Sequence, residues 1–290
     1  MPKVSVLIPT YNYARYLGEA IESVLNQTFT DFELIIVDDQ SKDNTDEVVQ
    51  KYLSDRRVTY HKNPVNLGLV GNFNRALELA NGDYIKFLLA DDKLDKTLLF
   101  KFVSVLDEYP GVSLVTSVSG TFGDSVQTRE LPLTGLQSGQ KVIMESLNHG
   151  KGNWIGEPSV VMFRKKSLIL GKFNPAYICL VDLDMWLRLL TTGDCYIVPE
   201  TLAYFRKHGK QASDKSEIRN WFDEYYFYRD VKKKNNYNVD LAQLDIDAVI
   251  KRKAKKCLKR VSSLFPRFYK KGNLSLIIEG LKIGRAEKIF

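Results

Sequence analysis

Short apolar runs and helical apolar stripes alternate through the first 110 residues. The runs predict buried strands of a parallel sheet; they span residues 4–8, 32–37, 58–61 and 84–89. In the segments that follow them, apolar side chains recur every three or four positions, at residues 17–25, 45–53, 70–80 and 98–106. Strand and helix in this order predict an α/β fold with right-handed crossovers.

The second half of the chain has a weaker pattern. Residues 112–138 predict irregular β structure, and residues 160–163 and 202–208 predict two further strands. Between those strands, a helix that begins near Asp182 and ends at Gly193 carries apolar residues at core spacing.

Two of the predicted strands end in adjacent carboxylates, Asp38 with Asp39 and Asp91 with Asp92. Ligands of open α/β sheets bind at the carboxyl ends of the strands, so these four side chains are expected to share one cleft. Adjacent carboxylates repel each other unless a cation or water separates them. Mg²⁺ or Mn²⁺ carrying phosphate oxygens suits such a site. The alternative is a solvated loop in which Asp92 or Asp95 caps the next helix.

The turn after the first strand, Pro9 to Asn12, contains no glycine. An NAD-binding fold would have a glycine-rich phosphate loop at this point, and no Walker motif follows. A bound nucleotide would therefore need a metal ion to neutralise its phosphates. Of the two acids that begin the later helix, Asp182 and Asp184, one can act as a cap and the other is left over. His208 is a further candidate, although a lone histidine is more often a surface or core residue than a metal ligand.

Composition predicts a globular protein with one large domain, or one domain and an appendage: the chain has 290 residues, 44% hydrophobic and 27% charged. No apolar run approaches the roughly 20 residues of a membrane span. The chain enters a strand directly, so no signal peptide is expected. The three cysteines form neither a zinc pattern nor a disulfide framework, which predicts a reducing, cytoplasmic location.

Positive charge is concentrated at the C-terminal end. Residues 217–290 contain 18 Lys and Arg against 9 Asp and Glu, whereas residues 1–216 contain 24 against 26. This difference predicts a boundary near residue 216, with a helical extension beyond it. Apolar residues at helical spacing in the extension lie opposite a basic cluster, residues 251–260. These stripes either pack as ordinary core helices or attach the protein to an anionic membrane surface. No recognised motif supports nucleic-acid binding.

Taken in order, these motifs resemble the family 2 inverting glycosyltransferases of the GT-A fold. The resemblance covers about residues 4–213 and rests on the opening turn, the strand before Ser41, residues 66–76, the Phe87–Asp92 segment, Asp182–Arg188, and the Arg206-x-His208 pair. It implies a Rossmann-like, mostly parallel sheet flanked by helices in residues 1–216, followed by the helical extension 217–290.

The resemblance also implies the chemistry. A sugar would pass with inversion from a nucleotide-diphosphate sugar, most commonly a UDP-sugar, to an acceptor hydroxyl, and Asp182 would be the catalytic base. The residues implied to bind the nucleotide are Pro9, Thr10, Tyr11, Asn12, Asp38, Asp39, Ser41, Asn66, Gly68, Asn72, Ala90 and Asp91. The residues implied to hold a divalent Mn²⁺ or Mg²⁺ are Asp91, Asp92 and His208. The residues implied to contact the donor sugar or the acceptor are Glu157, Pro158, Ser159, Asp184, Trp186 and Arg206.

Three positions depart from the family pattern: Leu89 replaces an expected Asp, Gln40 a Gly, and Val181 an acid. The first removes a metal ligand, which His208 and the donor's diphosphate would have to replace. The expected acceptor is a glycan or a lipid-linked glycan, in bacterial or archaeal surface polysaccharide or glycolipid assembly. The expected location is the cytoplasm, with peripheral attachment to the inner face of the cell membrane as a second possibility. The alternatives are a non-catalytic nucleotide- or sugar-binding module and a sugar nucleotidyltransferase, whose usual basic, glycine-rich loop is missing here.

Overall fold

A computed structural model describes residues 1–149, 153–208, 217–267, 269 and 272–289. Within this part of the chain one nine-stranded sheet forms the centre of the molecule, in the order β3-β2-β1-β4-β8-β6-β9-β5, with β7 paired to β9. The strands are β1 (Val4–Thr10), β2 (Phe32–Asp38), β3 (Val58–Lys62), β4 (Tyr84–Phe87), β5 (Lys93–Leu94), β6 (Val112–Gly123), β7 (Gly135–Gln137), β8 (Met162–Arg164) and β9 (Asp194–Lys207).

The long ladders of this sheet are parallel. β1 pairs in parallel with β2 and β4, β2 with β3, and β6 with β9. The short ladders made by β5, β7 and β8 are antiparallel. The predicted α/β fold with a mostly parallel sheet is therefore confirmed.

The irregular β structure expected over residues 112–138 begins with β6, a strand of twelve residues whose ladder with β9 shifts register at three points. Its small polar side chains weaken the local hydrophobic signal, and its stability comes from the long ladder with β9. The strand expected at residues 160–163 begins later, because residues 158–160 form a 3-10 turn before β8. β4 ends at Phe87, so residues 88–92 leave the sheet and reach the rim.

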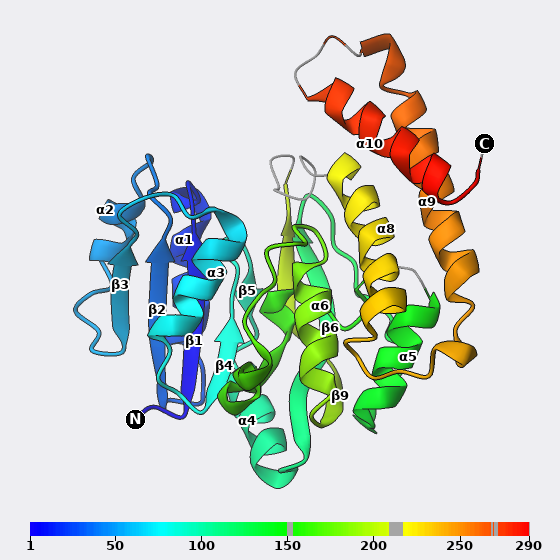
Figure 1. The fold of residues 1–290 in the computed structure, drawn as a ribbon. Coiled ribbons are helices and arrows are strands. Elements are labelled where there is room, and N and C mark those ends of the chain that lie inside the picture. The colour runs from blue at the N-terminus through cyan, green and yellow to red at the C-terminus, as the bar shows by residue number, and fades with distance from the viewer. Residues whose placement is uncertain (150–152, 209–216, 268, 270–271, 290) are drawn as a thin grey trace.

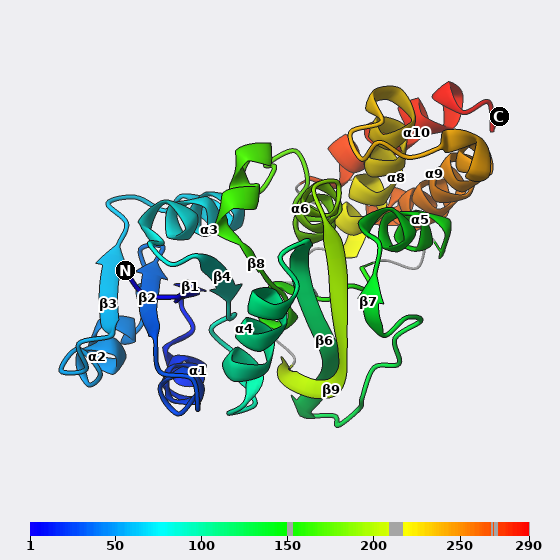
Figure 2. The same ribbon diagram turned by 90° about the horizontal axis from the view of Figure 1, so that it is seen from below.

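Helices cover both faces of the sheet (Figure 2). One face carries α1 (Ala14–Leu25), α2 (Thr45–Gln50) and α4 (Leu98–Glu108); the other carries α3 (Gly68–Leu79), α5 (Gly139–His149) and α6 (Val181–Leu190). Alternate residues of β1 and β2 belong to two separate buried clusters, as the two-residue period of a strand requires. This burial on both faces explains why the strands are apolar throughout.

The C-terminal segment forms α8 (Glu217–Lys234), α9 (Ile246–Ser262) and α10 (Asn273–Ala286) (Figure 1). The apolar stripes of α8 and α9 are buried in the same cluster as α6, so they pack as core helices. The side chain of Ile218, which was counted in the α8 stripe, lies outside the described residues. The boundary predicted near residue 216 also falls outside them and stays a prediction. No helix in the described ranges is both long and apolar enough to cross a bilayer.

Candidate active site

A cavity of about 770 Å³ opens where β1, β2 and β4 end. Its walls contain these predicted site residues: Pro9, Thr10, Tyr11, Asp39, Asn72, Ala90, Asp91, Glu157, Pro158 and Asp182. The Thr10 hydroxyl and one Glu157 carboxylate oxygen are buried there without a hydrogen-bond partner among the described residues. Unpaired buried polar atoms are costly, so a polar ligand is expected to complete this surface.

Asp39 lies in the cavity wall and organises the loop before α3. Its carboxylate accepts hydrogen bonds from Leu67 N (2.7 Å), Gly68 N (2.9 Å) and Asn63 Nδ2 (2.9 Å). Its backbone carbonyl accepts one from Asn66 Nδ2 at 2.8 Å. α3 has no side-chain cap of its own, so Asp39 satisfies its free N–H groups from a neighbouring strand. This geometry places the predicted Asn66 and Gly68 in a loop that supports the cavity.

Asp38 does not reach the cavity. It is fully buried, and its carboxylate accepts from Ser41 N and Tyr60 Oη, both at 3.0 Å. Ser41 Oγ in turn accepts from Asn12 N at 2.7 Å, which ties the turn after β1 to the turn after β2. The expectation that four carboxylates share one cleft is therefore wrong: Asp39 and Asp91 line it. Asp38 and Asp92 instead use buried donors as partners.

Asp92 links three segments behind the cavity. It is fully buried and accepts hydrogen bonds from Ser159 Oγ and from Arg206 N (3.1 Å). Burial, with the neighbouring charge of Asp91, raises the pKa of Asp92 well above its ordinary value. Ser159 Oγ also accepts from Leu89 N at 3.0 Å. Asp92 and Ser159, predicted as a metal ligand and a sugar contact, thus hold the rim segments together.

Asp91 and His208 face each other at the cavity edge, with 3.0 Å between Asp91 Oδ2 and His208 Nε2. The His208 ring packs against Tyr16 at a centroid distance of 4.8 Å. A carboxylate and an imidazole are suitable ligands for Mn²⁺ or Mg²⁺. No group of three or more acidic, histidine or cysteine side chains gathers to hold a metal anywhere in the described ranges, this site included. The pair fits a partial ligand set, which diphosphate and water oxygens would complete.

Arg206 supports Asp91 from outside the cavity. Its Nε donates to the Asp91 carbonyl at 2.9 Å, and its guanidinium pairs with Glu19. The same group lies over the Tyr16 and Phe122 rings at 4.8 and 4.2 Å. Arg206, predicted to contact sugar or acceptor, is instead placed to fix the segment that bears Asp91.

Asp182 lies in the first turn of α6 and lines the cavity. Leu180 occupies the cap position, and Asp182 Oδ1 accepts from Leu183 N at 2.7 Å. The side chain is partly exposed, yet loss of hydration raises its pKa from 3.8 to about 7, and the nearby Glu157 charge adds to this effect. Burial therefore outweighs the helix dipole, which would by itself favour the ionised form of Asp182.

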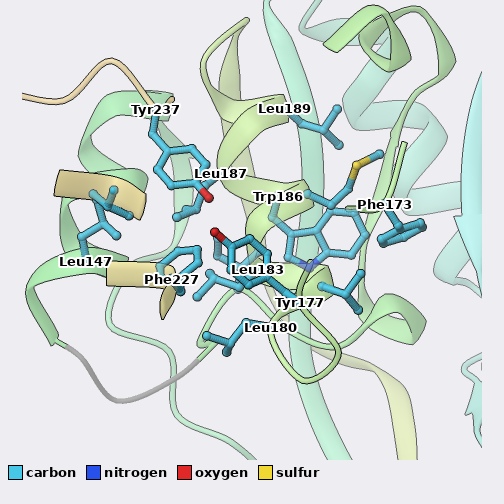
Figure 3. Close-up of a cluster of buried hydrophobic side chains, with 14 of the residues drawn as sticks. Leu147, Phe173, Tyr177, Leu180, Leu183, Trp186, Leu187, Leu189, Phe227 and Tyr237 are labelled. Atoms are coloured by element: carbon cyan, nitrogen blue, oxygen red, sulfur yellow. The ribbon is translucent and has the colours of Figure 1, made fainter. Parts of the chain in front are cut away.

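Trp186 packs in the buried hydrophobic cluster (Figure 3), and neither Trp186 nor Asp184 lines the cavity. The Asp184 carboxylate accepts from Tyr237 Oη at 2.8 Å and pairs with Arg188 at 2.9 Å. Trp186 is fully buried, and its Nε1 donates to the Gly156 carbonyl at 2.9 Å. Both had been predicted to contact sugar or acceptor. Since helical side chains two positions apart face different directions, Asp182 reaches the cavity and Asp184 does not.

The C-terminal helices hold the segment that leads to Asp182. One buried Asp223 oxygen on α8 accepts from both Ile178 N and Cys179 N, each at 2.8 Å. Tyr177 Oη donates to Asp230 at 2.9 Å. Asn220 of α8 lines the cavity directly. The extension therefore contributes to the site as well as to the core.

Sequence reasoning missed part of the cavity wall and its support. Arg129, Asn153 and Lys207 line the cavity, but no recognised motif contains them. Lys86 is fully buried, and its ammonium donates to the carbonyls of Phe87 (2.6 Å), Pro158 (3.3 Å) and Ser159 (2.5 Å). Burial lowers the pKa of Lys86 well below its ordinary value. A lysine within an apolar strand was the available signal for this role.

The sheet, the cavity at its strand ends and the acidic start of α6 match the features that the resemblance to GT-A glycosyltransferases implied. The chain belongs to glycosyl transferase family 2, whose family model matches residues 5–169.

Three curated relatives illustrate this membership. An uncharacterised protein of Mycobacterium tuberculosis is 34% identical over 220 residues, covering 71% of this chain and 67% of that protein. An uncharacterised glycosyltransferase of Rickettsia felis is 28% identical over 229 residues, covering 76% of this chain and 36% of that protein. The Campylobacter jejuni GalNAc(5)-diNAcBac-PP-undecaprenol beta-1,3-glucosyltransferase is 32% identical over 202 residues, covering 68% of this chain and 62% of that protein. The chain thus spans between about a third and two thirds of these relatives' lengths.

Solved structures share the fold. TarS residues 1–349 of S. aureus in complex with UDP-GlcNAc matches with a TM-score of 0.67 and 19% identity, over 96% of this chain and 79% of that chain. The mannosyltransferase PcManGT from Pyrobaculum calidifontis, in complex with GDP-Man and Mn²⁺, matches with a TM-score of 0.61 and 16% identity. That match covers 99% of this chain and 86% of the PcManGT chain.

Proposed function

We propose that this protein transfers a sugar, with inversion, from a nucleotide-diphosphate sugar to an acceptor hydroxyl, with Asp182 as the general base. The observation that carries the proposal is that Asp182 lines the same cavity as Asp39 and Asp91 and has a pKa of about 7. A base with a pKa near the working pH combines a useful ionised fraction with enough basicity to accept the proton.

The nucleotide would lie against the ends of β1 and β2. Pro9, Thr10 and Tyr11 line that part of the cavity together with Asp39 and Asn72. The unpaired Thr10 hydroxyl can hydrogen-bond a ribose or base atom. Asp38, Asn12 and Ser41 would act indirectly, by fixing the two turns that shape this wall.

Asp91 and His208 would hold a divalent cation, whose positive charge would stabilise the departing diphosphate. Arg206 would keep Asp91 in place through its bond to the Asp91 carbonyl. Asp182 would accept the proton of the acceptor hydroxyl as that oxygen attacks the anomeric carbon. The bond from that carbon to the diphosphate oxygen breaks in the same step, and the nucleoside diphosphate leaves. Glu157, with one free carboxylate oxygen at the cavity, would accept a hydrogen bond from a sugar hydroxyl.

We favour a UDP-sugar as the donor and a glycan or lipid-linked glycan as the acceptor. The structural neighbour TarS is in complex with UDP-GlcNAc, and the Campylobacter relative is named for an undecaprenol-linked glycan. These likenesses support a place in surface polysaccharide or glycolipid assembly, on the cytoplasmic side of the membrane.

We propose an anionic membrane surface as a further partner. The protein would attach to it through α10 and not through the apolar stripes of α8 and α9. Leu274, Ile278 and Leu281 are exposed along one side of α10, at 55%, 45% and 39%. The neighbouring helix α9 carries these exposed basic residues: Lys251, Arg252, Lys255, Lys256, Lys259 and Arg260. Lys253, counted earlier with this cluster, is instead buried and paired with Glu224 at 2.8 Å. Figure 1 places α10 at the opposite end of the molecule from the N-terminus, where β1 begins.

The function is tested with Asp182→Asn, assayed against wild type with a panel of nucleotide sugars in Mn²⁺. Transfer should fall at least a hundredfold, while donor affinity, measured by thermal shift, stays within a factor of about two. Activity within tenfold of wild type would contradict a general-base role. Donor binding with no transfer by wild type would favour a non-catalytic binding module. Release of pyrophosphate from a sugar phosphate and a nucleoside triphosphate would favour a nucleotidyltransferase.

A further inference from the structure

One wall of the cavity is a sheet surface whose side chains alternate in register. On one edge of β6, Thr121 pairs with Phe205 of β9. Gly123 pairs with Lys207 two residue pairs, or rows, further along the same ladder. On the other edge, Thr121 N donates to the Gln127 carbonyl at 2.7 Å. Because successive strand residues face opposite sides, side chains in matching rows share one face.

The same alternation places Arg129, a second positive side chain, on the face that carries Lys207. Arg129 N donates to the Ser119 carbonyl at 3.0 Å, so Arg129 lies two rows from Gln127 and faces the same side. Ser119, Gln127, Arg129 and Lys207 all line the cavity. The wall therefore presents hydroxyl, amide and cationic groups to whatever occupies this half of the site.

The two cations of this wall have no acidic partner. Within the described ranges, Arg129 and Lys207 are the basic residues that line the cavity, and neither forms an ion pair. The Lys207 ammonium lies 4.8 Å from the Phe205 ring centroid, a contact that orients it without neutralising it. Positive side chains that line a cavity attract anions, so this wall can receive a negative charge.

Arg129 is also held in a defined position beside the base. Its Nη2 donates to the Asn153 carbonyl at 2.6 Å, and Asn153 and Asp182 line the same cavity. The guanidinium forms no other hydrogen bond or ion pair within the described part of the chain, so its remaining N–H groups can bind a ligand. A guanidinium with free N–H groups binds phosphate and carboxylate oxygens well.

We infer that this wall binds an anionic group, a phosphate or a carboxylate, carried by the acceptor close to the reacting hydroxyl. Arg129 is its principal ligand, and Lys207 adds positive potential. The assignment to the acceptor rests on the proposed function: Asp182 meets the acceptor hydroxyl, and Arg129, held by the Asn153 carbonyl, lines the same cavity as Asp182. The donor's diphosphate belongs instead beside Asp91 and His208.

A binding experiment tests the site without turnover. Methyl phosphate and acetate are titrated by ligand-observed NMR into wild type, Arg129→Gln and the matched surface control Arg56→Gln, each saturated with UDP in the presence of Mg²⁺. At least one of the two anions should bind wild type and Arg56→Gln equally, and bind Arg129→Gln at least tenfold more weakly. The stronger anion identifies the group. Equal binding to all three proteins, or binding to none, would overturn the inference.

A kinetic experiment tests the assignment to the acceptor. A methyl hexoside, its 6-phosphate and the matching hexuronide are compared as acceptors. Arg129→Gln should lower kcat/KM for the preferred anionic acceptor at least tenfold, with kcat/KM for the neutral acceptor and the donor KM unchanged. An equal loss for charged and neutral acceptors would overturn it. Failure of the proposed function itself would appear separately, as full activity of Asp182→Asn.

Discussion

The Asp223 carboxylate accepts a hydrogen bond of 2.8 Å from Cys179 N, three residues before Asp182. The same oxygen accepts from Ile178 N, so a residue of the C-terminal segment fixes the backbone that leads to the proposed base. Asp223 is 1% exposed, and such a buried contact is not replaced readily by water.

Replacing Asp223 by Ala should lower both stability and transfer. Two buried N–H groups would lose their partner, at a cost of about 1–3 kcal/mol each, and the approach to Asp182 would loosen. Asp223→Asn, which keeps an acceptor oxygen, should retain most of the activity. The exposed Asp247→Ala is the control. Thermal unfolding and kcat at saturating donor are the measurements, and equal behaviour of Asp223→Ala and the control would contradict the role.

Activity should rise with pH through about 7 and then level off. Ionised Asp182 is the form that accepts a proton, and its pKa is raised to about 7 by burial. The acidic limb of the kcat/KM profile for wild type reports this group. Residual activity of Asp182→Asn should lack the limb. A wild-type profile flat from pH 5.5 to 8.5 would exclude Asp182 as the titrating base.

The same pKa predicts a stability effect of defined sign. The folded value lies above the ordinary 3.8, so between about pH 4 and 7 the native state binds more protons than the unfolded state. Stability from this group is present at low pH and is lost as pH rises through 7. Asp182→Asn does not ionise, so its Tm relative to wild type should increase from pH 5 to pH 8. A difference in Tm that is constant with pH would contradict the raised value.

Transfer should depend on a divalent cation held through Asp91 and His208. Asp91→Ala and His208→Ala should each weaken Mn²⁺-dependent UDP binding at least tenfold, because each removes one of two facing ligands. The matched control His61→Ala alters a histidine on β3, at the edge of the sheet. Isothermal titration with and without EDTA measures the effect. Full turnover in excess EDTA would rule out the metal.

Binding to vesicles should require the apolar side of α10. Replacing Leu274, Ile278 and Leu281 by Gln removes apolar surface that is already exposed, so the fold should persist while sedimentation with anionic vesicles is lost. Neutralising Lys255 and Lys259 of α9 should weaken binding and reduce its salt dependence, at about 1 kcal/mol per charge. Equal binding to neutral and anionic vesicles would contradict an electrostatic contribution. Concentration-dependent dimerisation that the Gln variant abolishes would instead assign α10 to a contact between copies.

The local hydrophobic pattern was sufficient to predict the order of strands and helices in the first 110 residues. β1 and β2 are buried on both faces, so they are apolar over most of their length and are readable without knowledge of their neighbours. The full length of β6 was not readable, because its partner β9 lies about eighty residues further along the chain.

The sequence by itself determined the family pattern, the acids at the strand ends and the position of Asp182 at a helix start. Tertiary structure alone decided which acids face the cavity. Asp38 and Asp39 are adjacent, yet Asp38 is enclosed by Ser41 and Tyr60 while Asp39 reaches the wall. It also decided that Arg129 and Lys207 share a wall and that Asp223 supports the base. These relations join segments far apart in the sequence, and side-chain direction depends on packing that no local pattern encodes.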